Sequence, residues 1–296
     1  MSLTQELRRE NSPIHTFLKQ HFPDKDGFWH TWSERIATLR TTRPQGPLVG
    51  YPWALVGTAI DYRIRVCWQP FVAEDTVAAI GGRLAHELEM GAAARVWPDL
   101  RDQWNLLTYF ITPPRPRALA VGREDRIARM SIIMAAYEGI ARSGRQDRLL
   151  QESISLNDAL HRVPNSVVAD FLGLLDRFRE SKDHYLYPQL IELNPVFDGS
   201  ALVGGADGDA ILDHTLWDFK TTIHPERASD SFWPYQLLGY GLLDLNDQYK
   251  TTGAGIYLVR QGAWLSWSWP DLIRLLGGDA SRNMQHWRGQ MLKVLH

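Results

Sequence analysis

Through the first two thirds of the chain, apolar residues recur three or four positions apart, a spacing typical of amphipathic helices. Residues 1–72 hold short patterns of this kind and end in an apolar run over 53–60. Residues 73–190 are predicted to be helical almost throughout. The clearest helical stretches there are 76–94, 123–142 and 166–179. We therefore expect an N-terminal helical segment (1–72) followed by a helical insertion (73–190).

From residue 191 onward the pattern changes to short runs that favour β-strands. One helix, at about 232–245, interrupts them, and a strand pair over 255–260 and 263–269 follows it. Residues 272–295 are predicted to form a closing helix. The segment 191–296 is thus predicted to be a sheet-based core with a C-terminal helix, which makes the chain an α/β protein.

A hairpin rich in charged residues is predicted in this core, with its turn at Asp213-His214. In that register Asp209 lies opposite Asp218, and Asp207 lies opposite Lys220. Side chains alternate faces along a strand, so all four side chains are expected on one face of the sheet.

Carboxylates gathered on one sheet face repel each other unless a cation lies among them. An oxygen-only set suits Mg²⁺ or Mn²⁺ and not zinc. A lysine beside such a metal is placed to hold a phosphate or to polarise an attacking water, which is the chemistry of metal-assisted phosphodiester hydrolysis. The alternative is a polar face on an exposed hairpin, because Asp-Xaa-Lys alone is a weak motif. The apolar neighbours Leu216, Trp217 and Phe219 favour a buried strand around Asp218.

Three segments together resemble the RecB-like branch of the PD-(D/E)XK nuclease superfamily. They are Gly204-Gly-Ala-Asp207, Leu216-Trp-Asp-Phe-Lys-Thr-Thr222 and Gln236-Leu-Leu-Gly-Tyr240, in the family's order and with similar spacing. The resemblance covers residues 190–262. It implies a restriction-endonuclease-like mixed central sheet flanked by helices, with a helical insertion of the kind that RecB-like proteins carry.

The resemblance also implies which residues hold the metal. Asp207 and Asp218 would bind Mg²⁺ or Mn²⁺, helped by the backbone carbonyl of Phe219. Asp209 has no firm counterpart in the family and is kept as an accessory or alternative ligand. Whether Asp207 or Asp209 is the main ligand therefore stays open.

The remaining catalytic roles follow from the same resemblance. Lys220 would orient or deprotonate the attacking water, and Gln236 would position the active site or the strand end. Tyr240 is expected one helical turn after Gln236, on the same helix face, where it would contact nucleic acid.

The family carries a further histidine or acid on an upstream helix, commonly as Gly-Xaa-Xaa-Xaa-His. The segment Gly57-Thr-Ala-Ile-Asp61-Tyr62 resembles it, with Asp61 in the place of the histidine. Asp61 is therefore either a further oxygen ligand of the metal or an ordinary helix-surface acid. His86, Glu87 and Glu192 compete for the same position.

Arginine is concentrated in the predicted insertion, where residues 115–148 hold eight arginines against four acids. Arginine suits phosphate because its planar guanidinium can bind two oxygens at once. We expect Arg126 and Arg129 to contact the nucleic-acid backbone. The alternative is a solvated helix face with internal ion pairs.

Composition limits the compartment and the kinds of partner more than it identifies an activity. The formal net charge of −2 gives no global attraction to nucleic acid, so contacts must come from local patches. A single cysteine, Cys67, excludes disulfide frameworks and a four-cysteine iron–sulfur cluster, and it suits a reducing cytoplasm. We expect no signal peptide, no membrane span and, without a phosphate-binding Gly-Lys-Ser/Thr loop, no ATPase activity.

These observations predict a Mg²⁺- or Mn²⁺-dependent nuclease that hydrolyses DNA phosphodiesters, with RNA as an open second substrate. By family analogy the context is bacterial or phage DNA processing, repair or defence, with protein partners in a larger complex. The alternative is a catalytically inactive nuclease-fold protein that binds nucleic acid or serves as an assembly subunit.

Overall fold

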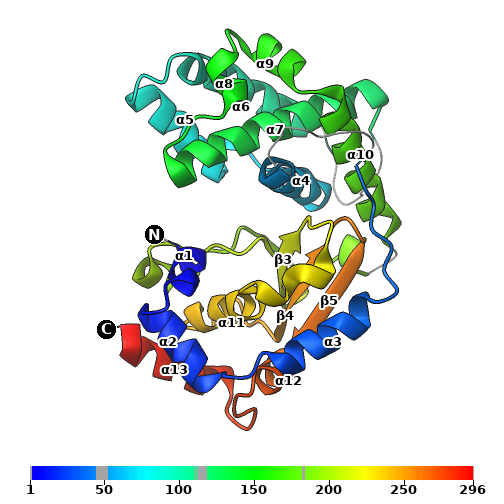
Figure 1. The fold of residues 1–296 in the computed structure, drawn as a ribbon. Coiled ribbons are helices and arrows are strands. Elements are labelled where there is room, and N and C mark those ends of the chain that lie inside the picture. The colour runs from blue at the N-terminus through cyan, green and yellow to red at the C-terminus, as the bar shows by residue number, and fades with distance from the viewer. Residues whose placement is uncertain (1, 45–52, 110, 112–118, 182–183, 296) are drawn as a thin grey trace. The chain divides into compact units, whose positions relative to one another are not determined.

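The computed structural model describes residues 2–44, 53–109, 111, 119–181 and 184–295 (Figure 1). The chain forms two compact units, which we call the sheet unit (1–41 and 188–296) and the helical unit (42–187). The helical unit thus begins about thirty residues before the predicted insertion at residue 73, because the apolar run over 53–60 lies in a helix of that unit. The second boundary, after Tyr187, lies close to the predicted one.

In the described part of the sheet unit, five strands form one mixed sheet in the order β1-β2-β3-β4-β5. All neighbours are antiparallel except β3 and β4, which run parallel. The α/β class expected from the sequence is therefore correct. The strands are β1 (Ile191–Leu193), β2 (Ala210–Leu212), β3 (Thr215–Lys220), β4 (Gly253–Leu258) and β5 (Ala263–Ser268).

The hairpin between β2 and β3 has the register predicted from the sequence. Ala210 pairs with Trp217, and Leu212 pairs with Thr215. The turn residues Asp213 and His214 have φ angles of 46° and 63°. Positive φ at both central residues is the geometry of the tight type I′ turn, whose twist matches that of the flanking strands.

Helix α11 packs against β3 and β4 (Figure 1), and α1, α12 and α13 contact it. The core on this side joins Leu216, Ile256 and Leu258 of the strands to Leu238 and Leu242 of α11. The helices are α1 (Leu3–Arg8), α2 (Pro13–His21), α3 (Asp26–Ile36), α11 (Trp233–Leu243), α12 (Trp269–Leu275) and α13 (Met284–Leu295), with short 3-10 helices η3 (Ser200–Val203) and η4 (Pro225–Asp230).

The predicted closing helix over 272–295 is wrong as a single element. The chain forms α12 and α13 with a turn between them, in which Gly277 has a φ of 74°. That left-handed conformation favours glycine and ends a helix. The break lets α13 fold back onto α2 and α11.

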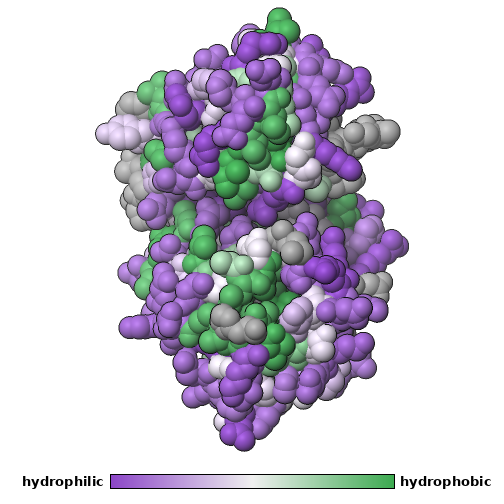
Figure 2. All heavy atoms as spheres, turned by 90° about the vertical axis from the view of Figure 1, so that its left-hand side faces the viewer, coloured by the Kyte–Doolittle hydropathy of each residue, from purple (hydrophilic) through white to green (hydrophobic). Residues whose placement is uncertain are grey.

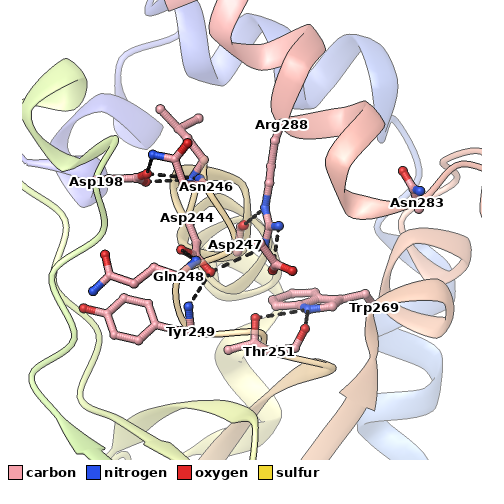
Figure 3. A network of polar contacts seen from close by, with 12 residues as sticks. Asp198, Asp244, Asn246, Asp247, Gln248, Tyr249, Thr251, Trp269, Asn283 and Arg288 are labelled. Atoms are coloured by element: carbon pink, nitrogen blue, oxygen red, sulfur yellow. Dashed lines mark hydrogen bonds and ion pairs between the residues drawn. The ribbon is translucent and has the colours of Figure 1, made fainter.

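A buried ion-pair network ties α13 to the loop between α11 and β4 (Figure 3). The Arg288 guanidinium donates to the Gly241 carbonyl at 3.0 Å and to Asp247 at 2.7 Å, and lies 3.5 Å from Asp244. Asp244 in turn accepts the backbone N–H of Gln248 at 2.8 Å. This loop is thus held by charged groups of which Arg288 and Asp244 are fully buried.

The helical unit is built around the long helix α7, which packs against α4, α5 and α10. Gly81 allows the close approach of α5, because a Cβ there would lie 1.8 Å from the Tyr137 carbonyl oxygen. The elements of this unit are α4 (Trp53–Trp68), η1 (Ala73–Asp75), α5 (Val77–Glu87), α6 (Ala92–Tyr109), α7 (Val121–Ser143), α8 (Arg148–Glu152), α9 (Leu156–Arg162), α10 (Asn165–Glu180) and η2 (His184–Leu186).

The helix predictions for this unit hold with one correction. The predicted stretches 123–142 and 166–179 correspond to α7 and α10, whereas 76–94 is split between α5 and α6 by a turn at Gly91. No helix in the part of the chain that the structure describes is long and apolar enough to cross a membrane. On the face drawn in Figure 2, polar residues cover most of the surface of each unit, with apolar residues between them.

Candidate active site at the end of strand β3

Asp218 and Lys220 project from β3 to the same face of the sheet, as their spacing requires. The Asp218 side chain is 6% exposed, and that of Lys220 is 20% exposed. Their charged groups form an ion pair with 2.5 Å between Oδ2 of Asp218 and Nζ of Lys220. A buried carboxylate is costly unless an opposite charge lies beside it, and the ammonium of Lys220 supplies that charge.

Asp209 directly precedes β2 and continues its register, which places it opposite Asp218. Its carboxylate accepts a hydrogen bond from the backbone N–H of Phe219, with 2.5 Å between Oδ2 and N. The Lys220 carbonyl points the other way, toward β4, where it accepts the N–H of Val259 at 3.0 Å. Along a strand successive peptide groups alternate direction, so the Phe219 carbonyl points toward the side of the acids.

Asp207 lies further along the same segment and pairs with Val196 through an isolated bridge. Asp207 and the other two acids all contribute to the electrostatic environment of the buried Tyr240 phenol. Burial raises the pKa of Tyr240 well above its usual range, and the negative charges of Asp218, Asp209 and Asp207 raise it further. All three carboxylates therefore act on one phenol, which stays neutral.

Gln236 links this phenol to the lysine. Both Gln236 and Tyr240 lie on α11, one turn apart, as predicted. The side-chain oxygen of Gln236 accepts from Lys220 Nζ at 3.2 Å, and its nitrogen donates to the Tyr240 hydroxyl at 2.8 Å. The amide thus orients the ammonium group with one atom and the phenol with the other.

Two neighbours of the site were not predicted from the sequence. The Thr4 hydroxyl of α1 lies 3.4 Å from the Gln236 amide nitrogen, and the indole of Trp233 lies 5.7 Å from Lys220 Nζ. Ser2, whose side chain accepts from the N–H of Gln5, is a sequence signal for the start of α1. No such local signal places α1 beside α11, because that contact depends on packing between distant segments.

The donor set at this site fits a hard divalent cation. It consists of carboxylate oxygens and one backbone carbonyl, and the buried Asp218 Oδ2 already lies 2.5 Å from a cationic group, the Lys220 ammonium. The acids do not already form a closed ligand shell: the described residues contain no group of three or more His, Cys, Asp or Glu side chains placed to hold a metal ion. A cation would have to draw the acids together and compete with Lys220 for Asp218.

Asp61 lies on α4 of the helical unit. It is buried, and its carboxylate binds the guanidinium of Arg65, with 2.8 Å between Oδ1 and Nε. That pairing accounts for the burial of Asp61 without a metal, and a ligand role for it stays a prediction. Of its competitors, His86 and Glu87 lie on α5, and Glu192 is exposed on β1.

Arg129 lines a polar pocket of the helical unit together with Arg126, and its guanidinium has several partners within that unit. Its guanidinium donates to Asp125, to the carbonyls of Leu160 and Val163, and to Asn165. These contacts hold the end of α9, and a phosphate contact by Arg129 stays a prediction. Arg126, which donates to Gln103, lines the same polar pocket of about 440 Å³, so its nucleic-acid role stays a prediction.

Other arginines of the 115–148 stretch also have carboxylate partners, which favours the internal-ion-pair interpretation for them. Arg142 binds Glu138 at 2.6 Å, and Arg148 binds Glu152 at 2.6 Å. Arg115 and Arg117 lie outside the described residues.

Comparison of the chain with protein-family models, with curated proteins and with solved structures finds no match.

Proposed function

We propose that the chain is a metal-dependent nuclease that hydrolyses DNA phosphodiesters, with a sheet unit of the restriction-endonuclease-like type and a RecB-like active site. The observation that carries this proposal is the Asp218–Lys220 pair, opposite Asp209 and held under Gln236 of α11. A buried acid and a lysine occupy successive positions on one face of β3, with further acids beside them. A strand with a purely structural role seldom carries such a group of charges, whereas functional sites often do.

Each residue has a role that follows from its position. Asp207 and Asp218, with the Phe219 carbonyl, would hold Mg²⁺ or Mn²⁺, and Asp209 either joins them or fixes the Phe219 peptide. The cation, when bound, neutralises charge on the phosphate. Lys220 would orient the attacking water as an ammonium or, in its neutral amine form, take the proton of that water, and Gln236 would hold the Nζ atom in place.

In this proposal the nucleic-acid backbone binds at the end of β3, because Lys220 is the last residue of that strand. Any phosphate bound there lies beside several carboxylates, so a cation is needed to offset their charge. Cleavage should therefore depend strictly on a divalent cation. Local basic groups must supply the remaining affinity, since the net charge of the chain is −2.

The experiment is a cleavage assay with the full chain on linear and circular DNA, single- and double-stranded, and on RNA of matched sequence. Mg²⁺ and Mn²⁺ are compared with EDTA. We expect cleavage of at least one DNA substrate with a cation and none in EDTA. Absence of cleavage across all substrates and both metals contradicts the proposal.

One observation favours a second candidate, a nuclease-fold protein that binds nucleic acid without cleaving it. Lys220 already neutralises Asp218 at 2.5 Å, so the pair is stable without a metal. In that case the wild-type chain binds DNA with the same affinity in EDTA and in Mn²⁺ and cleaves nothing.

A further inference from the structure

A second concave site lies in the sheet unit, between α3 and η4. It is a pocket of about 430 Å³, within the size range of small-ligand sites. Two indole rings, two serine side chains and a carboxylate stand among its walls. They belong to Trp29, Trp32, Ser33, Glu226 and Ser229, with Ala37 at the end of α3.

One wall of this pocket belongs to the chain segment that follows the candidate active site in sequence. η4 begins at Pro225, shortly after Lys220 ends β3. The indole N–H of Trp32 donates to the Pro225 carbonyl at 3.0 Å, which fixes α3 against η4.

An aromatic contact connects the pocket with the lysine itself. The rings of Trp32 and Trp233 lie 5.6 Å apart, and the Trp233 ring lies 5.7 Å from Lys220 Nζ. The Trp233 indole thus lies between Trp32 of the pocket wall and the ammonium group of Lys220. A ligand that reached both the pocket and Lys220 would have to be extended. One of its groups would bind at Lys220, and a planar part would lie in the pocket.

The polar groups of the pocket offer both a donor and an acceptor. The exposed Ser229 hydroxyl on the pocket wall can donate or accept a hydrogen bond. Glu226 Oε1 lies 2.8 Å from His224 Nδ1, which restrains the carboxylate. Hydrogen bonds from its own backbone N–H and from His224 lower the pKa of Glu226, so it is an ionised acceptor at neutral pH.

Exposed cations flank the pocket along the chain. Arg40 follows Leu39 of the pocket wall, and Arg227 follows Glu226. Such residues suit the phosphates on either side of a bound nucleotide. The partly exposed ring of Trp29 suits the base, since every nucleobase presents a flat face for stacking, whereas Trp32 is buried behind it.

We propose that this pocket binds an unpaired nucleobase of the substrate, next to the phosphate at Lys220. This inference rests on the proposed function and narrows its substrate class to single-stranded segments and unpaired ends. A base within a duplex is stacked on both faces and cannot enter without being extruded. The Trp29 ring would stack on the base, and the Ser229 hydroxyl and the Glu226 carboxylate would bind groups at the edge of the base.

The test fills the pocket with larger side chains at wall positions that are not part of the hydrophobic core. Ser33→Leu and Ala37→Leu add aliphatic volume at exposed wall residues without adding a stacking ring. His30→Leu is the matched control, because His30 is exposed on the same helix and is not part of the pocket wall. Affinity for a labelled single-stranded oligonucleotide and for a blunt duplex of the same sequence is measured with Ca²⁺, which supplies a hard divalent cation for the acids, and again in EDTA.

We expect the two filling variants to bind the single strand about tenfold more weakly, the size of one lost base–aromatic stack. Affinity for the blunt duplex should not change, and His30→Leu should match the wild type. Circular dichroism checks that the variants are folded. A second measurement needs no variant: photo-crosslinking of a single-stranded oligonucleotide that carries 5-iodouracil should modify the peptide that contains Trp29 and Trp32.

The outcomes separate this inference from the proposed function. If the wild type cleaves DNA but both filling variants bind the single strand normally, or the crosslink maps elsewhere, the base pocket is wrong and the nuclease stands. If the wild type cleaves nothing but the variants lose single-strand binding, the pocket stands and the nuclease is wrong. A wild type that binds no oligonucleotide overturns both.

Discussion

The carboxylate of Asp209 binds the backbone N–H of Phe219, with 2.5 Å between the two atoms. This peptide lies between Asp218 and Lys220, so Asp209 acts on the spacing of the two catalytic candidates. Its carboxylate also supplies an acceptor where the neighbouring strand would otherwise supply a backbone carbonyl, just before β2 begins. An acid at this point can thus be needed for geometry even if it never touches a metal.

Asp209→Ala and Asp209→Asn separate these two roles. The alanine variant loses a charge-assisted hydrogen bond, and we expect its free energy of unfolding to fall by about 1.5–3 kcal/mol. The asparagine variant keeps an acceptor oxygen and should lose less. If Asp209 only positions the strand, the Asn variant keeps its Mn²⁺ affinity in calorimetric titration. A loss of affinity as large as that of Asp207→Asn would instead make Asp209 a ligand.

Asp218→Asn is expected to remove cation binding, because it deletes the charge of a buried ligand. Mn²⁺ at about 100 times its dissociation constant should stabilise the wild type by about 2.7 kcal/mol. The measurement is thermal unfolding with Mn²⁺ and with EDTA. Asp198→Asn is the control, since Asp198 binds the backbone N–H groups of Leu245 and Asn246 away from β3. An Mn²⁺-dependent shift that survives in Asp218→Asn would place the cation elsewhere.

Lys220→Ala should abolish cleavage while leaving DNA binding nearly intact. General acid–base catalysis contributes about 10²–10⁴-fold to a rate, whereas a single lysine contributes one phosphate contact at most. Single-turnover rates and the salt dependence of binding are measured side by side. Lys293→Ala, an exposed lysine on α13, is the matched control. Equal cleavage by Lys220→Ala would remove the hairpin from the catalytic site.

Gln236→Leu should slow cleavage by about tenfold, because it removes one hydrogen bond that orients Lys220. Gln236→Glu keeps an acceptor for the ammonium and should recover part of the rate. Gln285→Leu, at an exposed position of α13, controls for the change in polarity. The split between KM and kcat is informative here: a positioning role lowers kcat, and a change confined to KM would contradict it.

Arg288→Met should destabilise the sheet unit by about 3–5 kcal/mol, because it leaves Asp244 buried without its cation. Burial already raises the pKa of Asp244, and Arg288 opposes that effect. The folded variant should therefore bind the Asp244 proton more tightly than the unfolded chain does, so its stability falls as pH rises through the raised pKa.

Urea unfolding at pH 5 and pH 7.5 tests the sign. We expect the loss in Arg288→Met to be larger at pH 7.5 than at pH 5. Adding Asp244→Asn should recover part of the loss, because the unpaired charge is gone. An equal loss at both pH values would show that Arg288 stabilises by packing alone.

Local sequence features were sufficient to predict the hairpin and its charged face. Strand alternation places Asp218 and Lys220 on one side, and the Asp213-His214 turn sets which residues of β2 lie opposite them. The i, i+4 spacing of Gln236 and Tyr240 likewise predicts their common helix face. These relationships span few residues and follow from backbone geometry, so they can be derived before any packing is known.

Only the tertiary structure decided which distant segments meet. The parallel pairing of β3 with β4, the contact of Thr4 with Gln236 and the assignment of residues 42–72 to the helical unit all join parts far apart in sequence. Arg129 makes the same point: its sequence context favours phosphate, and its folded context binds it to Asp125, Asn165 and two carbonyls. Periodicity specifies which face of an element is apolar, whereas the partner of that face depends on packing across the whole core.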